Sequence, residues 1–338
     1  MIASESSERI TRPVVVWLMR LMLSVLMSFG SELLLWNDLP AREVIDWLLV
    51  LIGMLVISTI SIDLLIRLRL RDLPGLMTLA GVYALLNALV INPDSTLFDI
   101  PRTLVTRVTG AHALIGLEML ILFLALLSGR RGLFQRVVLF GAVVVGLAWG
   151  TWVRWAVTLD DGPQLVFDST AILVTTIAAG LMVFLMITLI IRRGAELRPE
   201  EVLMTRAEWF AAVIILLVMV MIQLGRGTLP SQAMLIVGIL LVLCYAMLWF
   251  RRSTRLEVFA DQVFPPQRFN PLWLLATIGL FIASAATAYD APEFRAGDLN
   301  QLSIIVYGFT LYGLAWLPTV SLWLGMRAYL RQVMSRQQ

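Results

Sequence analysis

Three side chains suited to acid–base or ion-binding chemistry lie in one apolar stretch of the sequence. Arg107, the single histidine His112 and Glu118 all occur between residues 100 and 128. Glu118 stands about ten residues from either end of an apolar run that is long enough to cross a bilayer. An ionised carboxylate at that depth is costly, so an acid there is a candidate coupling group or part of a solute path. The alternative is a neutral glutamic acid that is hydrogen-bonded to a neighbouring helix.

The preceding apolar run, residues 73–91, supplies the predicted neighbours of Glu118. If the two runs pack as antiparallel helices, Tyr83 lies at the depth of Glu118 and is its predicted hydrogen-bond partner, with Asn87 close by. These three residues are the predicted floor of a cleft that opens to the outside of the cell.

Three further residues are predicted to form the mouth of this cleft. Arg107 shares a helix face with Glu118 and lies about 16 Å from it along the helix axis. His112 lies one turn below the membrane interface, and Arg154 lies in the outer half of a later apolar run. The plainer alternatives are an interfacial hydrogen-bonding role for the histidine and an outward-reaching, solvated position for Arg154.

Aspartates precede several apolar runs. Asp99, Asp168 and Asp298 each stand where an acid accepts the free N–H groups of a helix start and suits the helix dipole. The alternative is a metal–diphosphate site that includes Asp94 and Asp160, but the spacing does not match aspartate-rich motifs of that kind. Helix capping is therefore the favoured interpretation, and no metal site is predicted.

The composition excludes several kinds of chemistry. All 26 basic residues are arginine, so a lysine Schiff base and the lysine of a phosphate-binding loop are impossible. One cysteine and one histidine exclude an internal disulfide, a CxxC pair and HExxH zinc chemistry. A GxSxG elbow and a paired-carboxylate motif are also missing from the sequence. We therefore assign no catalytic residue and no cofactor, and an enzyme is not favoured.

The elements that must position these residues are membrane-spanning helices. The chain has 338 residues, of which 59% are hydrophobic and 14% charged, and its mean hydropathy is +0.87; soluble domains are nearer 25% charged. The sequence predicts an all-α, polytopic bundle that forms a single integral membrane domain over residues 1–338 and contacts the lipid bilayer. The ten predicted spans are 13–36, 44–66, 73–91, 110–128, 137–157, 169–191, 209–224, 231–250, 271–289 and 303–327.

The charges of the connections alternate along the chain. Arginine clusters at residues 67–71, 130–136, 192–193, 251–255 and 327–336 alternate with aspartate-bearing connections. The positive-inside rule places the arginine clusters and both termini in the cytoplasm, so the spans form five outward-pointing hairpins. We expect a multi-pass protein of the plasma (cytoplasmic) membrane, which in bacteria is the cell inner membrane. In this setting the arginines report topology, and no nucleic-acid partner is predicted.

Two features bear on packing and on partners. Gly146 and Gly150 form a GxxxG spacing, which lets two helix backbones approach closely in lipid. Residues 198–207 and 255–264 are predicted to be short amphipathic segments on the cytoplasmic face. Such segments are also able to dock a soluble partner.

These observations support one function most directly. The first hypothesis is a transporter or channel-like protein for a small polar or anionic solute. The alternative is a non-catalytic membrane subunit or scaffold with a cytoplasmic or membrane protein partner, for which the amphipathic segments argue. A third hypothesis, an outer-face enzyme acting on lipid-linked substrates through the aspartates and His112, is the least supported.

Overall fold

The computed structural model describes residues 2–35, 43–129, 133–156, 169–194, 197–252, 258–292, 295–296, 299–320 and 322–337. Apart from two paired strands of two residues each, the regular structure of the described residues is helical. The elements are α1 (Ile2–Ser28), η1 (Phe29–Leu34), α2 (Val44–Arg67), α3 (Leu73–Val90), α4 (Pro93–Thr96), η3 (Leu104–His112), α5 (Ala113–Ser128), α6 (Leu133–Ala156), α7 (Ser169–Arg193), α8 (Pro199–Val202), α9 (Arg206–Gly225), α10 (Ser231–Arg251), α11 (Phe259–Val263), α12 (Pro271–Asp290), β1 (Arg295–Ala296), β2 (Leu299–Asn300), α13 (Gln301–Thr319) and α14 (Leu322–Gln337).

Among the described residues, ten helical stretches are long and apolar enough to cross a membrane. They match the ten predicted spans in order, which marks the chain as an integral membrane protein. Three boundaries differ by six residues or more. The sixth stretch begins at Thr176 instead of residue 169, although the helix α7 itself begins at Ser169. The fourth stretch begins at Leu104 instead of residue 110, because the π-helical segment η3 extends it. The tenth ends at Thr319 instead of residue 327, just after Pro318, and α14 follows as a separate helix. Proline interrupts the hydrogen-bond pattern of a helix, which accounts for the early end of the tenth stretch.

The interior of the bundle consists of α2, α3 and the continuous η3–α5 helix. In the apolar window of η3–α5, 83% of the residues are buried, against 11% in α13. The peripheral helices expose large apolar side chains such as Phe210, Leu235 and Leu311. Such surfaces suit contact with lipid.

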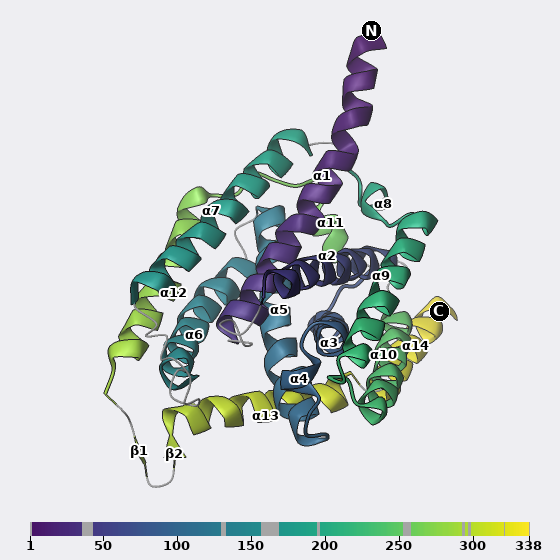
Figure 1. The fold of residues 1–338 in the computed structure, drawn as a ribbon. Helices are drawn as coiled ribbons and strands as arrows, with labels where there is room; N and C mark the ends of the chain where they lie inside the picture. The colour runs from purple at the N-terminus through teal and green to yellow at the C-terminus, as the bar shows by residue number, and fades with distance from the viewer. Residues whose placement is uncertain are drawn as a thin grey trace.

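Helices that are distant in the sequence lie side by side. α6 packs mainly on α12. α1 contacts α7 as well as its sequence neighbour α2, and α10 contacts both α3 and α14. In Figure 1, α7, α6 and α12 stand on one side of α5, while α9, α10 and α14 stand on the other. α13 packs against η3 and crosses the lower ends of α5 and α6 (Figure 1).

The GxxxG pair lies at the α6–α12 contact, as a close-packing motif requires. A Cβ atom on Gly146 would lie 2.6 Å from the carbonyl oxygen of Phe281, and one on Gly150 would meet the carbonyl of Ala285 at still closer range. Both obstacles are backbone atoms, which a side-chain rotation cannot move away. The two glycines therefore set the separation of α6 and α12.

We expect Gly150→Ala to lower the free energy of unfolding by about 1–2 kcal/mol, because the added methyl group forces α6 and α12 apart. The measurement is equilibrium unfolding by SDS titration in detergent micelles. Gly238→Ala is the matched control, since nothing lies within 4 Å of the added Cβ there. Alanine favours helix over glycine, so this control is expected to be neutral or slightly stabilising. Equal effects of the two substitutions would contradict the proposed role of Gly150.

Candidate functional site

Two π-helical segments meet inside the bundle. π-Helical turns are rare and occur frequently at functional sites. η1 ends the first span and carries Ser31 and Glu32, and η3 begins the fourth span and ends at His112. In η3 the Thr109 hydroxyl donates to the carbonyl oxygen of Leu104, five residues earlier, at 3.2 Å. The two segments thus bring polar residues to one point between the helices.

Asn87 of α3 lies at the centre of the polar residues that these segments supply. Its side-chain nitrogen donates to Ser31 Oγ at 2.7 Å and lies 2.9 Å from His112 Nδ1. Its carbonyl oxygen accepts from Asn92 Nδ2 at 3.0 Å. Asn87 is completely buried. We call Ser31, Glu32, Asn87, Asn92 and His112 the Glu32–His112 network.

The hydrogen bonds of the network converge on the Glu32 carboxylate. Glu32 Oε1 accepts from the Ser31 hydroxyl at 2.8 Å and from Asn92 Nδ2 at 2.9 Å. Only 1% of the Glu32 residue is exposed. Donors of this kind offset part of the cost of burying an acid. The network is therefore built to hold a carboxyl group inside the bundle.

The same geometry defines the tautomer of the histidine. An amide nitrogen only donates, so His112 Nδ1 accepts the hydrogen bond from Asn87 and the ring proton lies on Nε2. The orientation of the Asn87 amide follows from its second contact, since its oxygen faces the donor nitrogen of Asn92. His112, with 2% exposure, is thus a hydrogen-bonded part of the interior.

Glu118 lies apart from this network, at a cavity of about 240 Å³ between α1, η1, α5, α6, α7 and α12. Most of the lining is aliphatic or aromatic. Glu118 is the one ionisable side chain among the described residues that line it. No hydrogen bond or ion pair joins Glu118 to another residue of the described ranges. The Thr176 hydroxyl, also in the lining, is buried and has no hydrogen-bond partner there either.

The predicted contact between Tyr83 and Glu118 is not present. The Tyr83 ring lies against Gly116, where an added Cβ would be 2.5 Å from ring atom Cδ1. Its hydroxyl donates to the carbonyl oxygen of Met27 at 3.4 Å. Gly116 and Glu118 are two residues apart and so face different sides of α5. The structure therefore places Asn87 in contact with His112, while Glu118 lies on a different face of α5 from the one that contacts Tyr83.

The residues predicted to form the mouth of the cleft have different surroundings in the structure. The Arg107 guanidinium is exposed, donates to the carbonyl oxygen of Ser95 at 2.6 Å and lies 5.3 Å from the centre of the Phe98 ring. It thus holds the connection between α3 and η3. Arg154 belongs to α6, but its side chain lies outside the described part. Asp99 forms an ion pair with Arg102 at 2.7 Å, and Asp160, Asp168 and Asp298 lie outside the described residues.

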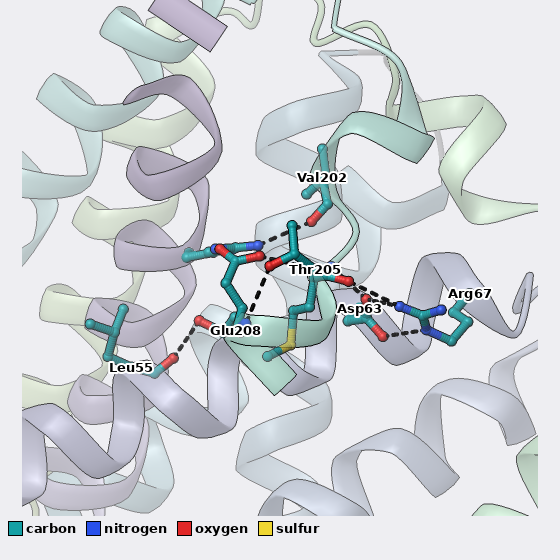
Figure 2. Close-up of polar contacts among 9 residues, drawn as sticks. Leu55, Asp63, Arg67, Val202, Thr205 and Glu208 are labelled. Atoms are coloured by element: carbon teal, nitrogen blue, oxygen red, sulfur yellow. Dashed lines mark hydrogen bonds and ion pairs between the residues drawn. The ribbon is translucent and has the colours of Figure 1, made fainter. Parts of the chain in front are cut away.

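A second buried acid, Asp63, lies near the C-terminal end of α2. Asp63 is completely buried and binds the Arg67 guanidinium through two hydrogen bonds of 2.7 and 2.9 Å. It also accepts from the backbone N–H of Met204 at 2.7 Å and from Trp209 Nε1 at 3.3 Å. Figure 2 shows Asp63 facing Arg67 next to the turn that carries Thr205. We call this group the Asp63 clamp, because it fixes the start of α9 to α2.

Arg20 of α1 joins the same region. Arg20 is buried and forms an ion pair with Glu208. It also donates to the carbonyl oxygen of Val202 at 3.4 Å, and Glu208 completes a capping box with Thr205 (Figure 2). Glu208 lies 188 residues from Arg20 in the sequence, so the local sequence around Arg20 does not predict this ion pair.

Both segments that were predicted to be amphipathic and cytoplasmic pack on the bundle. In the first, α8 covers Pro199–Val202, and Val202 is buried against α2. In the second, α11 covers Phe259–Val263, and the N–H of Phe259 donates to the carbonyl oxygen of Leu70 at 2.9 Å. Their apolar faces are therefore occupied by the chain itself.

Sequence reasoning missed Ser31, Glu32, Asn92 and Asp63. Glu32 interrupts the last turns of the first apolar run and Asp63 those of the second, so each carried the same signal as Glu118, an acid inside a span. Within the described residues, no cluster of three or more His, Cys, Asp or Glu side chains is arranged to hold a metal ion.

The fold and these groups define a polytopic integral membrane protein with a buried polar network and a separate acid-bearing cavity. Compared with protein-family models, with curated proteins and with solved structures, the chain matches none.

Proposed function

We propose that this protein is a transporter whose coupling or gating site is the Glu32–His112 network. The observation that carries the proposal is the junction of two π-helical segments at a buried carboxyl and imidazole. Ionisable residues inside spans are costly, and in transporters they form ion sites and proton relays. A purely structural contact between helices does not require a carboxyl group there.

The cargo that we propose is a small polar solute that is neutral or cationic. The sequence favoured a small polar or anionic solute. The carboxyl groups of the buried Glu32 and the half-buried Glu118 argue against an anion, because like charges repel strongly where water is scarce. Arg107, the described arginine nearest in sequence to His112, is engaged with Ser95 and Phe98.

We propose that solute enters from the outer face of the plasma membrane. The arginine clusters place both termini in the cytoplasm under the positive-inside rule. On that orientation the connection from Asn92 to Asp99, which borders the network, is extracellular. The Asp63 clamp then lies at the cytoplasmic ends of α2 and α9.

Cysteine accessibility tests this proposal without knowledge of the cargo. In a Cys244→Ser background, Ala111→Cys places a thiol next to His112, at a residue that is 6% exposed. A membrane-impermeant thiol reagent is applied to intact cells and, separately, to inside-out vesicles. Because a transporter exposes its site to each side in turn, we expect labelling from both sides. Ala125→Cys, in the packed part of α5, is the matched control and is expected to stay unlabelled.

The competing class, a non-catalytic scaffold, predicts a different result. A static network excludes water from both sides, so Ala111→Cys would stay as unreactive as the control in a folded protein. That outcome would refute the transporter proposal. The packing of α8 and α11 on the bundle already weakens the scaffold hypothesis, because their apolar faces are not available for a partner.

A further inference from the structure

The cavity at Glu118 has the composition of a binding site for a lipophilic cation. Besides aliphatic side chains, it is lined by the aromatic rings of Phe29, Phe140 and Phe281. Aromatic faces attract cations, most strongly where water is excluded. A carboxyl group is the natural counter-charge for an ammonium ion. Apolar walls with a few polar groups that fix orientation are typical of ligand sites.

Two polar groups of the cavity have no partner in the part of the chain that the structure describes. The Thr176 hydroxyl, in a residue that is 4% exposed, has no hydrogen-bond partner there. The carboxyl group of Glu118, a half-buried residue, likewise forms no hydrogen bond or ion pair with a described residue. Buried polar groups are ordinarily hydrogen-bonded, so each exception requires an explanation. A ligand that donates hydrogen bonds and carries a positive charge would satisfy the carboxyl, and its N–H groups suit the hydroxyl as well.

The volume limits the size of the ligand. At about 240 Å³ the cavity is larger than an engineered apolar cavity of roughly 150 Å³ that binds benzene inside a protein core. A single aromatic ring with a short alkylammonium arm fits this range. The lining also includes the exposed Phe140 on the outer face of α6, so a ligand dissolved in the bilayer is able to enter from the side.

We propose that the cavity between α1, α5, α6, α7 and α12 binds a small lipophilic ammonium ion, with Glu118 as its counter-charge. The aromatic rings hold the apolar part of the ligand, and Thr176 accepts a hydrogen bond from the ammonium group. This site is separate from the Glu32–His112 network. Binding at equilibrium does not depend on whether the protein transports a solute, so the two proposals stand or fall separately.

A matched pair of ligands tests the inference. Radiolabelled 2-phenylethylammonium carries the charge, and propylbenzene has nearly the same shape without it. Each is equilibrated with the purified full-length protein in lipid nanodiscs, with nanodiscs lacking protein as the blank. We expect saturable binding of the ammonium ion and at least tenfold weaker binding by Glu118→Gln, which keeps the size of the side chain but removes its charge.

Further variants separate charge from shape. Glu200→Gln makes the same chemical change at an exposed position of α8 and is expected to leave binding unchanged. Thr176→Val is expected to weaken binding of the ammonium ion but not of propylbenzene. Gly141→Met, which points a larger side chain toward Glu118 from a position 3.8 Å away, is expected to abolish binding of both ligands.

Two results would overturn the proposal. If both ligands bind equally and neither responds to Glu118→Gln, the cavity is a groove for uncharged apolar groups such as lipid chains. The protein must first be shown to be folded, by an unchanged unfolding temperature. If neither ligand then binds to it more than to nanodiscs without protein, the cavity is not a ligand site.

Discussion

Replacing Asn87 with leucine is expected to lower the free energy of unfolding by about 3 kcal/mol, because three hydrogen-bonding groups lose a buried partner at about 1 kcal/mol each. Asn87 contacts Ser31 Oγ, His112 Nδ1 and Asn92 Nδ2 within 3.0 Å. Leucine has a similar size, so the loss measures the hydrogen bonds more than the packing. SDS titration in detergent micelles, followed by tryptophan fluorescence, gives the free energy.

Thr78→Val on the same helix is the control for this change. Thr78 is also completely buried, but its hydroxyl donates only to the carbonyl oxygen of Pro74 within α3, at 2.7 Å. Its replacement removes a local bond and is expected to cost less than about 1 kcal/mol. If the two substitutions destabilise the protein equally, the Glu32–His112 network does not hold η1, α3 and η3 together.

The ten spans were predictable because length and hydropathy are local properties of the sequence. A run of about 20 apolar residues identifies a membrane helix without knowledge of its neighbours. The tenth span shows the limit, since an apolar run continued past Pro318 where the helix itself ends. Hairpin order gave no information on packing: α6 packs on α12, more than a hundred residues further along the chain, through the two glycines.

The candidate site was only partly predictable for a related reason. Asn87 and His112 were recognised as polar residues inside spans, but their contact depends on the π-helical segment η3. That segment shifts the helical phase, so regular spacing along an α-helix does not predict the contact between Asn87 and His112. Tyr83 was assigned to Glu118 by depth alone, and depth does not specify the face of a helix. Tyr83 instead donates a hydrogen bond to the backbone of Met27 in the first span.

Segment η1 connects the two sites that we propose. Its residues Ser31 and Glu32 belong to the Glu32–His112 network, while Phe29 and Leu34 line the cavity of Glu118. A change in the hydrogen bonding of Glu32 that reshaped this short segment would alter the cavity wall at the same time. Coupling between two sites requires a structural element that has two arrangements and whose equilibrium is shifted by both sites.

The Asp63 clamp is expected to make the largest single contribution to stability. Asp63→Ala should lower the free energy of unfolding by about 3–4 kcal/mol, because it breaks a buried ion pair and leaves other donors unsatisfied. Those donors are the backbone N–H of Met204 and Nε1 of Trp209, both at the start of α9. Arg67 is less affected, since 45% of its side chain is exposed and water can replace the carboxylate.

Asp46→Ala on the same helix provides the comparison. Asp46 pairs with Arg226 at 2.8 Å, but 27% and 43% of these side chains are exposed. Exposed ion pairs contribute about 0–1 kcal/mol, so this substitution should change stability little. Asp63→Asn is expected to fall between the two, because its amide oxygen still accepts from Met204 while the charge is lost. If Asp63→Ala were as mild as Asp46→Ala, α9 would be held to α2 by apolar packing alone, and the clamp would have no role in joining α9 to the core.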